Sequence, residues 1–265
     1  MKNIWNIAVY TMREAMMKKV FLAFSIISTL GLVFNFAILK LAPIPPGLSN
    51  DSLYNFAIFV QAGAINSILP IGLLLSIFGV SFLTSKILEK GTAELFLSKP
   101  LSRTEFLFGR ILGSLLIVAL NISYLCVGAW IIFGATFGFW TPVILIIIPL
   151  TLLAFLALYS LIVLSTVAFR SYVSGLLVAI FILLVLSPIL AAKDNYLPYI
   201  NAEWAKALIN TLYYIIPKTS EMLSKIPNSV LRGLSDVSPQ PFLTTAAFIV
   251  AVLFASDYIF KRKDY

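Results

Sequence analysis

Residues 106–133 read FLFGRILGSLLIVALNISYLCVGAWIIF, and this run holds a single charged side chain, Arg110. A helix of about 20 apolar residues spans the hydrocarbon layer of a bilayer, which is about 30 Å thick. Inside that layer, backbone N–H and C=O groups must find partners within their own segment, which a helix provides and an open strand does not. The run therefore predicts a transmembrane helix.

The rest of the chain repeats this pattern. Its 265 residues are 60% hydrophobic, with a mean hydropathy of +1.00, whereas ordinary soluble chains are about 45–50% apolar. Six apolar runs are long enough to cross a membrane: residues 20–41, 61–85, 106–133, 141–169, 173–192 and 242–260. We therefore expect an all-α integral membrane protein with six transmembrane helices, forming one transmembrane domain over residues 1–265.

The residue types exclude most catalytic chemistry. The chain has one cysteine, Cys126, and no histidine, which excludes an internal disulfide, a His-based metal site and a Ser-His-Asp triad. It also lacks a Gly-x-x-x-x-Gly-Lys-Ser/Thr loop for binding nucleotide phosphates. We expect no enzymatic activity, no metal and no directly bound cofactor. The net charge of +8 is expected to face anionic lipid and not nucleic acid.

The N-terminal segment, residues 1–19, has an amphipathic pattern. Within KNIWNIAVYTMREAMMKK (2–19), Trp5, Val9, Met12 and Met16 recur at helical spacing. Such a helix is expected to lie along the membrane surface as an elbow before the first span. Trp5, Met12 and Arg13 are the residues expected to hold it in place.

Basic residues predict the orientation. With the N-terminus inside, thirteen Lys and Arg residues lie on the inner side: 2, 13, 18, 19, 86, 90, 99, 103, 110, 170, 261, 262 and 263. Six lie outside: 40, 193, 206, 218, 225 and 232. Because cytoplasmic loops carry the excess of Lys and Arg, both termini are expected in the cytoplasm of a multi-pass protein of the cell membrane.

Two connections are expected on the outer side. Residues 41–52 contain three prolines and a glycine, which predicts a turn-rich loop. Residues 193–241 form the longest polar connection, in which residues 204–215 have helical spacing. A short external or half-embedded helical hairpin fits this connection. A seventh crossing is the alternative, but it would place residues 261–263 outside, against the basic-residue bias.

Within the spans almost no charged side chain lies at mid-depth, and Arg110 and Asp257 lie near the inner ends. Coupled carriers keep charged residues inside the membrane, so the lack of them at mid-depth argues against self-driven transport. Uncharged side chains are candidates for lining a path: Asn66, Asn121, Tyr124 and Ser160. The favoured interpretation of each is an interhelical hydrogen-bond partner. Small-residue pairs at 109/113 and 134/138 allow close helix approach, and Pro142, Pro149 and Pro188 either kink helices or mark their ends.

Charge is concentrated between the second and third spans. Residues 89–110 read EKGTAELFLSKPLSRTEFLFGR. Ser102 is placed to cap a helix beginning near Arg103, with Glu105 completing a capping box. The segment 86–105 therefore predicts a cytosolic helical hairpin. It is either a solvated loop that orients the protein or a docking surface, and its mixed signs and fixed turn residues favour docking.

The same stretch resembles the conserved cytosolic segment of the ABC-2 class of ATP-binding-cassette permeases. The matching elements are Glu-Lys-Gly-Thr at 89–92, Ser-Lys-Pro-Leu-Ser-Arg at 98–103 and Arg-x-x-Gly at 110–113. The chain is most similar to the short subfamily that includes the permease serving nitrous-oxide-reductase maturation. Residues 212–222, LYYIIPKTSEM, are similar to a further stretch of such permeases.

The resemblance implies a non-catalytic permease subunit, an exporter driven by ATP and Mg²⁺ at a separate ATP-binding subunit. Two permease copies, expected as a homodimer, would pair with two such subunits, and an external protein is a further candidate partner. The resemblance implies docking by Glu89, Lys90, Gly91, Glu94, Lys99, Pro100 and Arg103. The alternative function is a membrane-embedded assembly or anchoring protein that transports nothing.

Overall fold

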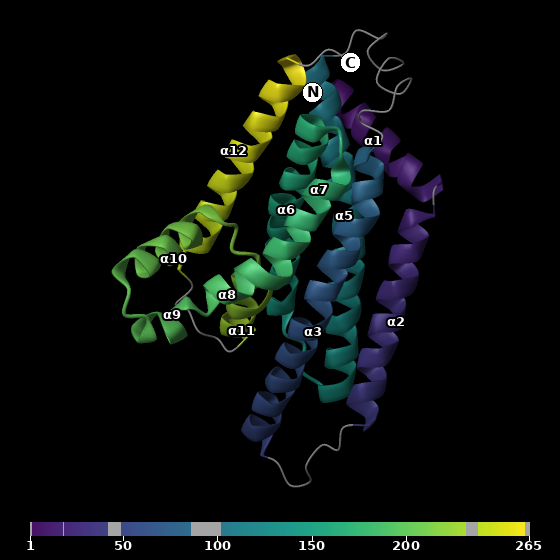
Figure 1. Cartoon of the computed structure of the whole chain (residues 1–265). Coiled ribbons are helices and arrows are strands. Elements are labelled where there is room, and N and C mark those ends of the chain that lie inside the picture. The colour runs from purple at the N-terminus through teal and green to yellow at the C-terminus, as the bar shows by residue number, and fades with distance from the viewer. Residues whose placement is uncertain (1, 18, 42–48, 86–101, 232–237, 263–265) are drawn as a thin grey trace.

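The structure is a computed structural model that describes the whole chain except residues 1, 18, 42–48, 86–101, 232–237 and 263–265 (Figure 1). Every regular element in this part is a helix, and the described residues form no strand. The long α-helices are α1 (Lys2–Met17), α2 (Val20–Leu41), α3 (Asn50–Ser85), α5 (Arg103–Phe137), α6 (Ile147–Phe169) and α12 (Gln240–Arg262). The expected all-α fold class is confirmed.

Six segments of the described chain are helical, long and apolar enough to cross a membrane. They are Leu22–Lys40, Asn50–Phe82, Arg103–Phe137, Ile144–Phe169, Tyr172–Ala191 and Gln240–Arg262. The number of spans predicted from the apolar runs is therefore confirmed, and the protein is a multi-pass membrane protein.

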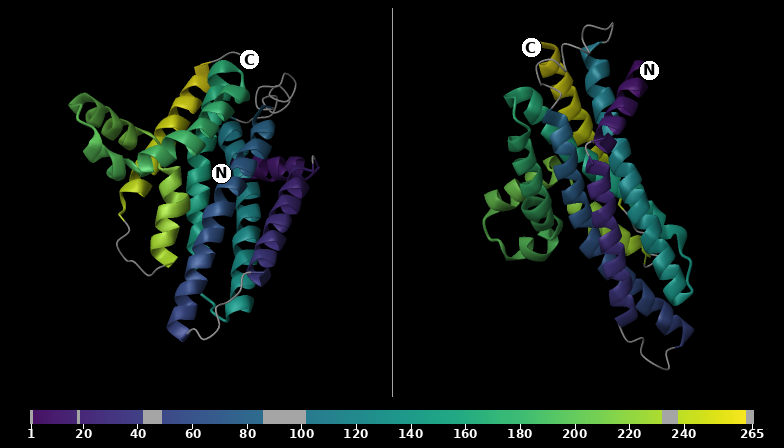
Figure 2. Two further views of the ribbon diagram at one scale, coloured as in Figure 1. Left: turned by 60° about the horizontal axis from the view of Figure 1, so that its bottom comes forward. Right: turned by 90° about the vertical axis from the view of Figure 1, so that its right-hand side faces the viewer.

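Helix α6 lies at the centre of the bundle (Figure 2). Its residues Ala154, Phe155, Leu158 and Ile162 are fully buried. It packs against α12, α3, α5 and the fifth crossing segment, which begins with α7 (Tyr172–Phe181). In contrast, α2 exposes Leu30 and Phe34 on the outside of the bundle. Large apolar side chains on that surface are suited to lipid, because lipid and side chain are equally apolar.

Helix α3 begins earlier than the second apolar run predicts. It starts at Asn50, not near residue 61, so residues 50–52 of the expected outer loop are helical. The hydroxyl of Ser49 accepts a hydrogen bond from the N–H of Ser52 at 3.3 Å, which satisfies a free donor of the first turn. Polar residues thus extend the helix past its apolar run.

Both ends of α5 follow local sequence signals. Ser102 Oγ accepts from the Glu105 N–H at 3.1 Å, and Glu105 Oε2 accepts from the Ser102 N–H at 3.1 Å. This confirms the predicted capping box. At the other end Gly138, with φ +76°, terminates the helix in the left-handed region that glycine tolerates.

The pair 134/138 is therefore not a helix-packing pair. Gly138 lies beyond the end of α5, and Gly134 is covered by the ring of Trp140, which folds back over it. The expectation of close approach between two helices at this pair is wrong, because the spacing describes a helix end.

The prolines have different positions. Pro142 begins a 3₁₀ turn (Pro142–Ile146) that leads into α6, and Pro149 lies in the first turn of α6. Pro188 lies within the fifth crossing segment, in α8 (Ser187–Ala191), directly after a π-helical turn (Ile182–Leu186). A proline has no N–H and its ring clashes with the carbonyl four residues earlier, here that of Leu184. The π turn absorbs this disruption.

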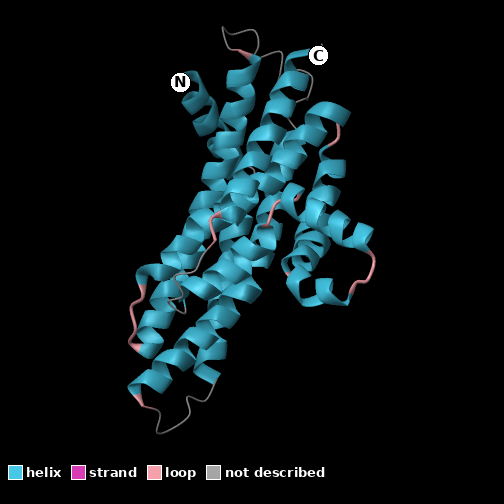
Figure 3. Ribbon diagram, turned by 90° about the vertical axis from the view of Figure 1, so that its left-hand side faces the viewer, coloured by secondary structure: helices cyan, strands magenta, loops and turns pink. Residues whose placement is uncertain are grey.

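The outer connection contains short helices beside the bundle (Figure 3). They are α9 (Lys193–Tyr196), a 3₁₀ turn (Leu197–Tyr199), α10 (Glu203–Ile215), a π turn (Glu221–Lys225) and α11 (Ile226–Leu231). With 13 residues at about 1.5 Å each, α10 is too short to span a bilayer. Among the described residues of this connection, no seventh crossing helix occurs.

Several chain ends meet at one end of the bundle. Helix α1, the C-terminal turn of α12, the end of α3 and the beginning of α5 all lie there, opposite the end of α2 and the beginning of α3 (Figures 1 and 3). This end carries the candidate site.

Candidate functional site

The expected docking residues Glu89, Lys90, Gly91, Glu94, Lys99 and Pro100 lie outside the described residues. Their flanks are described, since α3 ends at Ser85 and α5 begins at Arg103. The candidate site is therefore built from the elements around these flanks. We call it the terminal platform: α1, the first turns of α5 (103–114) and the last turn of α12 (258–262).

Two glycines of α5 bring α1 into close contact. A Cβ placed on Gly109 would lie 2.6 Å from Ile7 Cβ, and one placed on Gly113 would lie 2.7 Å from the Ala8 carbonyl oxygen. Side chains of α1 on this face are buried, with Ala8, Thr11 and Ala15 at 0% exposure. The pair 109/113 thus has the close-packing role that its spacing allowed. Its partner is the N-terminal helix.

The three residues expected to hold α1 lie differently. Met12 is half-buried and packs against the core, whereas Trp5 is 55% exposed and Arg13 is exposed. The contact with Gly109 and Gly113 is made by Ile7, Ala8 and Thr11. A search for a face complementary to 109/113 would have pointed to these residues.

A buried ion pair joins the same two helices. Arg110 Nη1 donates to Glu14 Oε2 at 2.6 Å, with the two side chains 2% and 9% exposed. The guanidinium carbon lies 5.8 Å from the ring centroid of Tyr10 and 5.7 Å from that of Phe106. A charge pair in an apolar setting fixes the register between two helices, since removing either charge leaves the other desolvated. Sequence reasoning treated Arg110 only as an inner-side charge.

Two further contacts extend the platform. Asn3 Nδ2 donates to the Glu105 carboxylate at 3.3 Å, which connects the start of α1 to the capping box. Arg103 Nη1 donates to the carbonyls of Phe260 and Lys261, both at 3.4 Å. These carbonyls end α12, where a cation is favoured by the helix dipole. Arg103, expected to dock a partner, contacts the last turn of α12.

Tyr159 connects both flanks of residues 86–101 to the core. Its hydroxyl lies 2.9 Å from Thr84 Oγ1 on α3 and 3.0 Å from Ser114 Oγ on α5. All three side chains are almost fully buried, and the Tyr159 ring stacks on Phe155 at 5.3 Å. A displacement of the end of α3 or of the beginning of α5 would therefore also displace Tyr159 on α6.

We expect Tyr159→Phe to lower the free energy of unfolding by about 1 kcal/mol, because two buried hydroxyls lose their shared partner. Thermal unfolding of the purified protein in detergent measures this. Tyr124→Phe is the matched control: Tyr124 is 47% exposed, and its hydroxyl lies 2.9 Å from Thr29 Oγ1. Equal losses in the two variants would contradict a special role for Tyr159.

The candidate path-lining residues lie apart. Asn66 Nδ2 donates to Asn228 Oδ1 at 3.3 Å, Asn121 accepts from Ser28 at 2.9 Å, and buried Ser160 donates to the Ala157 carbonyl at 2.7 Å. Of the four candidates, only Asn121 lines an apolar cavity formed by residues of α2, α3 and α5. The other hydrogen bonds hold neighbouring helices or turns.

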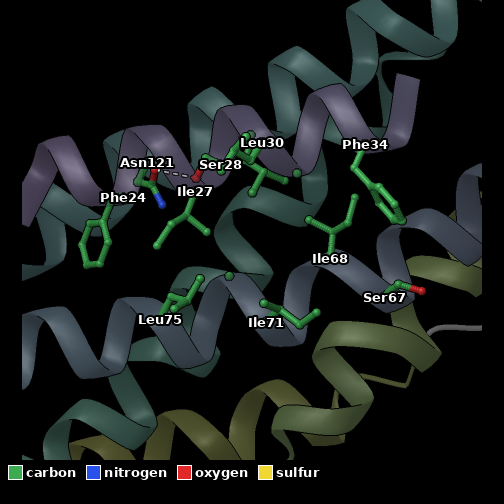
Figure 4. A pocket seen from close by; sticks show the side chains of 13 residues that line it. Phe24, Ile27, Ser28, Leu30, Phe34, Ser67, Ile68, Ile71, Leu75 and Asn121 are labelled. Atoms are coloured by element: carbon green, nitrogen blue, oxygen red, sulfur yellow. Dashed lines mark hydrogen bonds between the residues drawn. The ribbon is translucent and has the colours of Figure 1, made fainter. Parts of the chain in front are cut away.

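That cavity lies between α2, α3 and α5 and has a volume of about 340 Å³. Its lining is apolar apart from a few polar groups, among them the hydrogen-bonded pair Ser28 and Asn121 at one side (Figure 4). Such a lining suits an apolar ligand or a lipid chain, with the amide as a single polar contact. It holds no acid–base pair.

The described residues contain no cluster of side chains that could bind a metal ion. Among the residues that the structure describes, no three His, Cys, Asp or Glu side chains gather closely enough to hold a metal ion. Cys126 is buried. The described part of the platform contains close helix packing, one buried ion pair and capping of helix carbonyls.

No family model matches the chain, and a search of curated proteins finds no match. Function has to be argued from the platform and the sequence.

Proposed function

We propose that this chain is the membrane-spanning permease subunit of an ABC-2 type transporter, an exporter that uses ATP hydrolysed by a separate ATP-binding subunit. The observation that supports this most is the terminal platform. In this platform, α1 and α12 both contact the beginning of α5. That part of α5 directly follows residues 86–101, the stretch that resembles the docking segment of such permeases. A force applied to this segment would reach three helices at once.

The orientation supports the same proposal. Lys and Arg residues 2, 13, 103, 110, 261 and 262, six of the thirteen that the sequence assigns to the inner side, lie in the platform helices, so this end would be the cytoplasmic end of a protein in the cell membrane. Helix α1 would then be the elbow at the cytoplasmic surface. Its exposed Trp5 and Met16 would face the headgroup region, where amphipathic aromatic and apolar side chains are favoured.

The proposed mechanism has two copies of this chain and two ATP-binding subunits. Closure of the ATP-binding subunits would push on residues 86–105, folded as a cytosolic hairpin. The ion pair Glu14–Arg110 would move α1 with α5, and Tyr159 would transmit the displacement to α6. ATP and Mg²⁺ belong to the partner, so this chain contributes no catalytic residue.

Charge reversal tests the docking surface. We expect Glu89→Lys to reduce co-purification of the ATP-binding subunit at least tenfold, because one docking charge is reversed at a charge-complementary interface. Glu203→Lys makes the same change at an exposed residue of α10, outside residues 86–105 and the terminal platform. Stoichiometry is read from affinity-purified complexes by quantitative gel densitometry.

If Glu89→Lys and Glu203→Lys retain the partner equally, residues 86–105 do not dock it. If no ATP-binding protein co-purifies with the unmodified chain, the permease proposal fails in favour of an anchoring protein. Arg103→Glu is unsuited to this test, because Arg103 also contacts the end of α12.

A further inference from the structure

We propose that the outer connection binds the phosphate headgroup of an outer-leaflet phospholipid, in a cavity beside α10. This site lies away from the terminal platform and does not depend on the permease proposal. Two separate observations support it: an exposed apolar face on α10 that suits lipid, and a polar cavity behind that face with a buried lysine, Lys218, next to it.

Helix α10 has two faces. Trp204, Leu208 and Ile215 recur at helical spacing and are 74%, 52% and 58% exposed. The opposite face turns inward, where Tyr213 is buried and Asn210 accepts from Lys193 Nζ at 3.2 Å. The helix lies to one side of the six crossing helices (Figures 1 and 3). An amphipathic helix with an exposed tryptophan is favoured at the bilayer interface.

The cavity behind α10 has a volume of about 360 Å³. It is lined by Lys193, Lys225, Tyr213, Asp194 and Glu221 among others, from the segments on either side of α10. With Lys218, which lines a small adjoining cavity sharing Tyr213 and Glu221, the cluster holds three lysines and two acids, a net charge of 3 − 2 = +1. A phosphodiester carries a single negative charge and would neutralise it.

Lys218 is the strongest sign of a missing anion. It is 4% exposed, and its Nζ has no hydrogen-bond partner among the described residues. The nitrogen lies 4.0 Å from the ring centroid of Tyr213, and Lys193 Nζ lies 3.8 Å from the same centroid. Burial lowers the pKa of Lys218, and the charge of Lys193 lowers it further, against the opposing effect of Glu221.

A buried ammonium without an acceptor is costly, and a nearby phosphate would relieve that cost. The Glu221 carboxylate accepts from the Tyr213 hydroxyl at 2.8 Å and forms no hydrogen bond with Lys218 Nζ. The phosphate would therefore take the remaining donors, Lys193 and Lys218, while its acyl chains follow the apolar face of α10 into the outer leaflet.

The test is a titration of the full-length protein in detergent with dioctanoyl-phosphatidylglycerol, read by native mass spectrometry. One bound lipid is expected at low micromolar addition. Lys193→Gln and Lys218→Gln are expected to weaken it at least tenfold. Lys206→Gln is the matched control, since it removes the same charge from α10 outside the cavity lining, and its affinity is expected to stay within twofold.

Two further probes separate the sources of the phosphate. Dioctanoylglycerol, which lacks phosphate, is expected not to compete, and equal competition would overturn the headgroup assignment. Glycerol phosphate, which lacks acyl chains, is expected to compete at least tenfold more weakly; equal competition would assign the cavity to a free phosphoester and overturn the lipid. A loss of lipid affinity in Lys206→Gln equal to that in Lys193→Gln would overturn the site. If Lys218→Gln does not fold, Lys193→Gln and Lys225→Gln decide.

Discussion

Gly113→Ala is expected to lower the free energy of unfolding by about 2 kcal/mol, as overpacking of a tight contact does. The added Cβ would lie 2.6 Å from Thr11 Cβ, 2.7 Å from the Ala8 carbonyl oxygen and 3.1 Å from Ala8 Cα. Two of these atoms are backbone, so the clash is relieved only by moving α1 away from α5. Thermal unfolding in detergent measures the loss, and faster proteolysis after Arg13 would report the loosened helix.

Gly63→Ala provides the matched control. A Cβ on Gly63, in the middle of α3, meets nothing within 4 Å. Alanine there is expected to be neutral or to stabilise by about 0.5–1 kcal/mol, because it restricts the unfolded chain and favours the helix. If both variants behave alike, the close contact between α1 and α5 is not what holds the platform together.

Removing one partner of the buried ion pair is expected to have the largest effect. Glu14→Leu would leave Arg110, 2% exposed, without the carboxylate that lies 2.6 Å from its Nη1. Breaking a buried pair in this way costs about 3–5 kcal/mol. The loss is measured as the fall in folded, monodisperse protein and in melting temperature.

A double-mutant cycle separates lost attraction from an uncompensated charge. In Glu14→Leu with Arg110→Leu both charges are absent, and most of the stability is expected to return, because apolar replacements of buried pairs are often neutral. Lys261→Met is the control at the partly exposed pair Asp257–Lys261, where the lysine side chain is 55% and the aspartate side chain 11% exposed, and a loss of about 1 kcal/mol or less is expected. A double mutant with a melting temperature no higher than that of Glu14→Leu alone would show that the charge of Arg110, once Glu14 is removed, does not destabilise the protein.

The spans were predictable because lipid imposes one requirement, an apolar helix of sufficient length. Residues 20–41, for example, coincide with α2. The start of α3 was missed because Asn50, Asp51 and Ser52 are polar, and hydropathy cannot distinguish a helix emerging from the membrane from a loop. The capping box at Ser102 was found because it is a local pattern, independent of tertiary contacts.

The contacts of the platform were not predictable from one helix at a time. The amphipathic pattern of α1 predicted a helix along the membrane surface, but it did not indicate which residues contact α5. Close packing against Gly109 and Gly113 selects Ala8 and Thr11, which are not members of the apolar set that defines the pattern. Gly134/Gly138 and Gly109/Gly113 have the same spacing, and only the partner atoms distinguish a helix end from a helix contact.

The central claim is that a separate ATPase drives this chain through the terminal platform. The most direct measurement is ATP hydrolysis by the co-purified complex in lipid discs, comparing the unmodified chain with Gly113→Ala. The proposal predicts that the permease raises the hydrolysis rate of its ATP-binding partner severalfold, and that Gly113→Ala removes most of this increase while the partner stays bound. A partner whose rate is unchanged by the permease would contradict the claim.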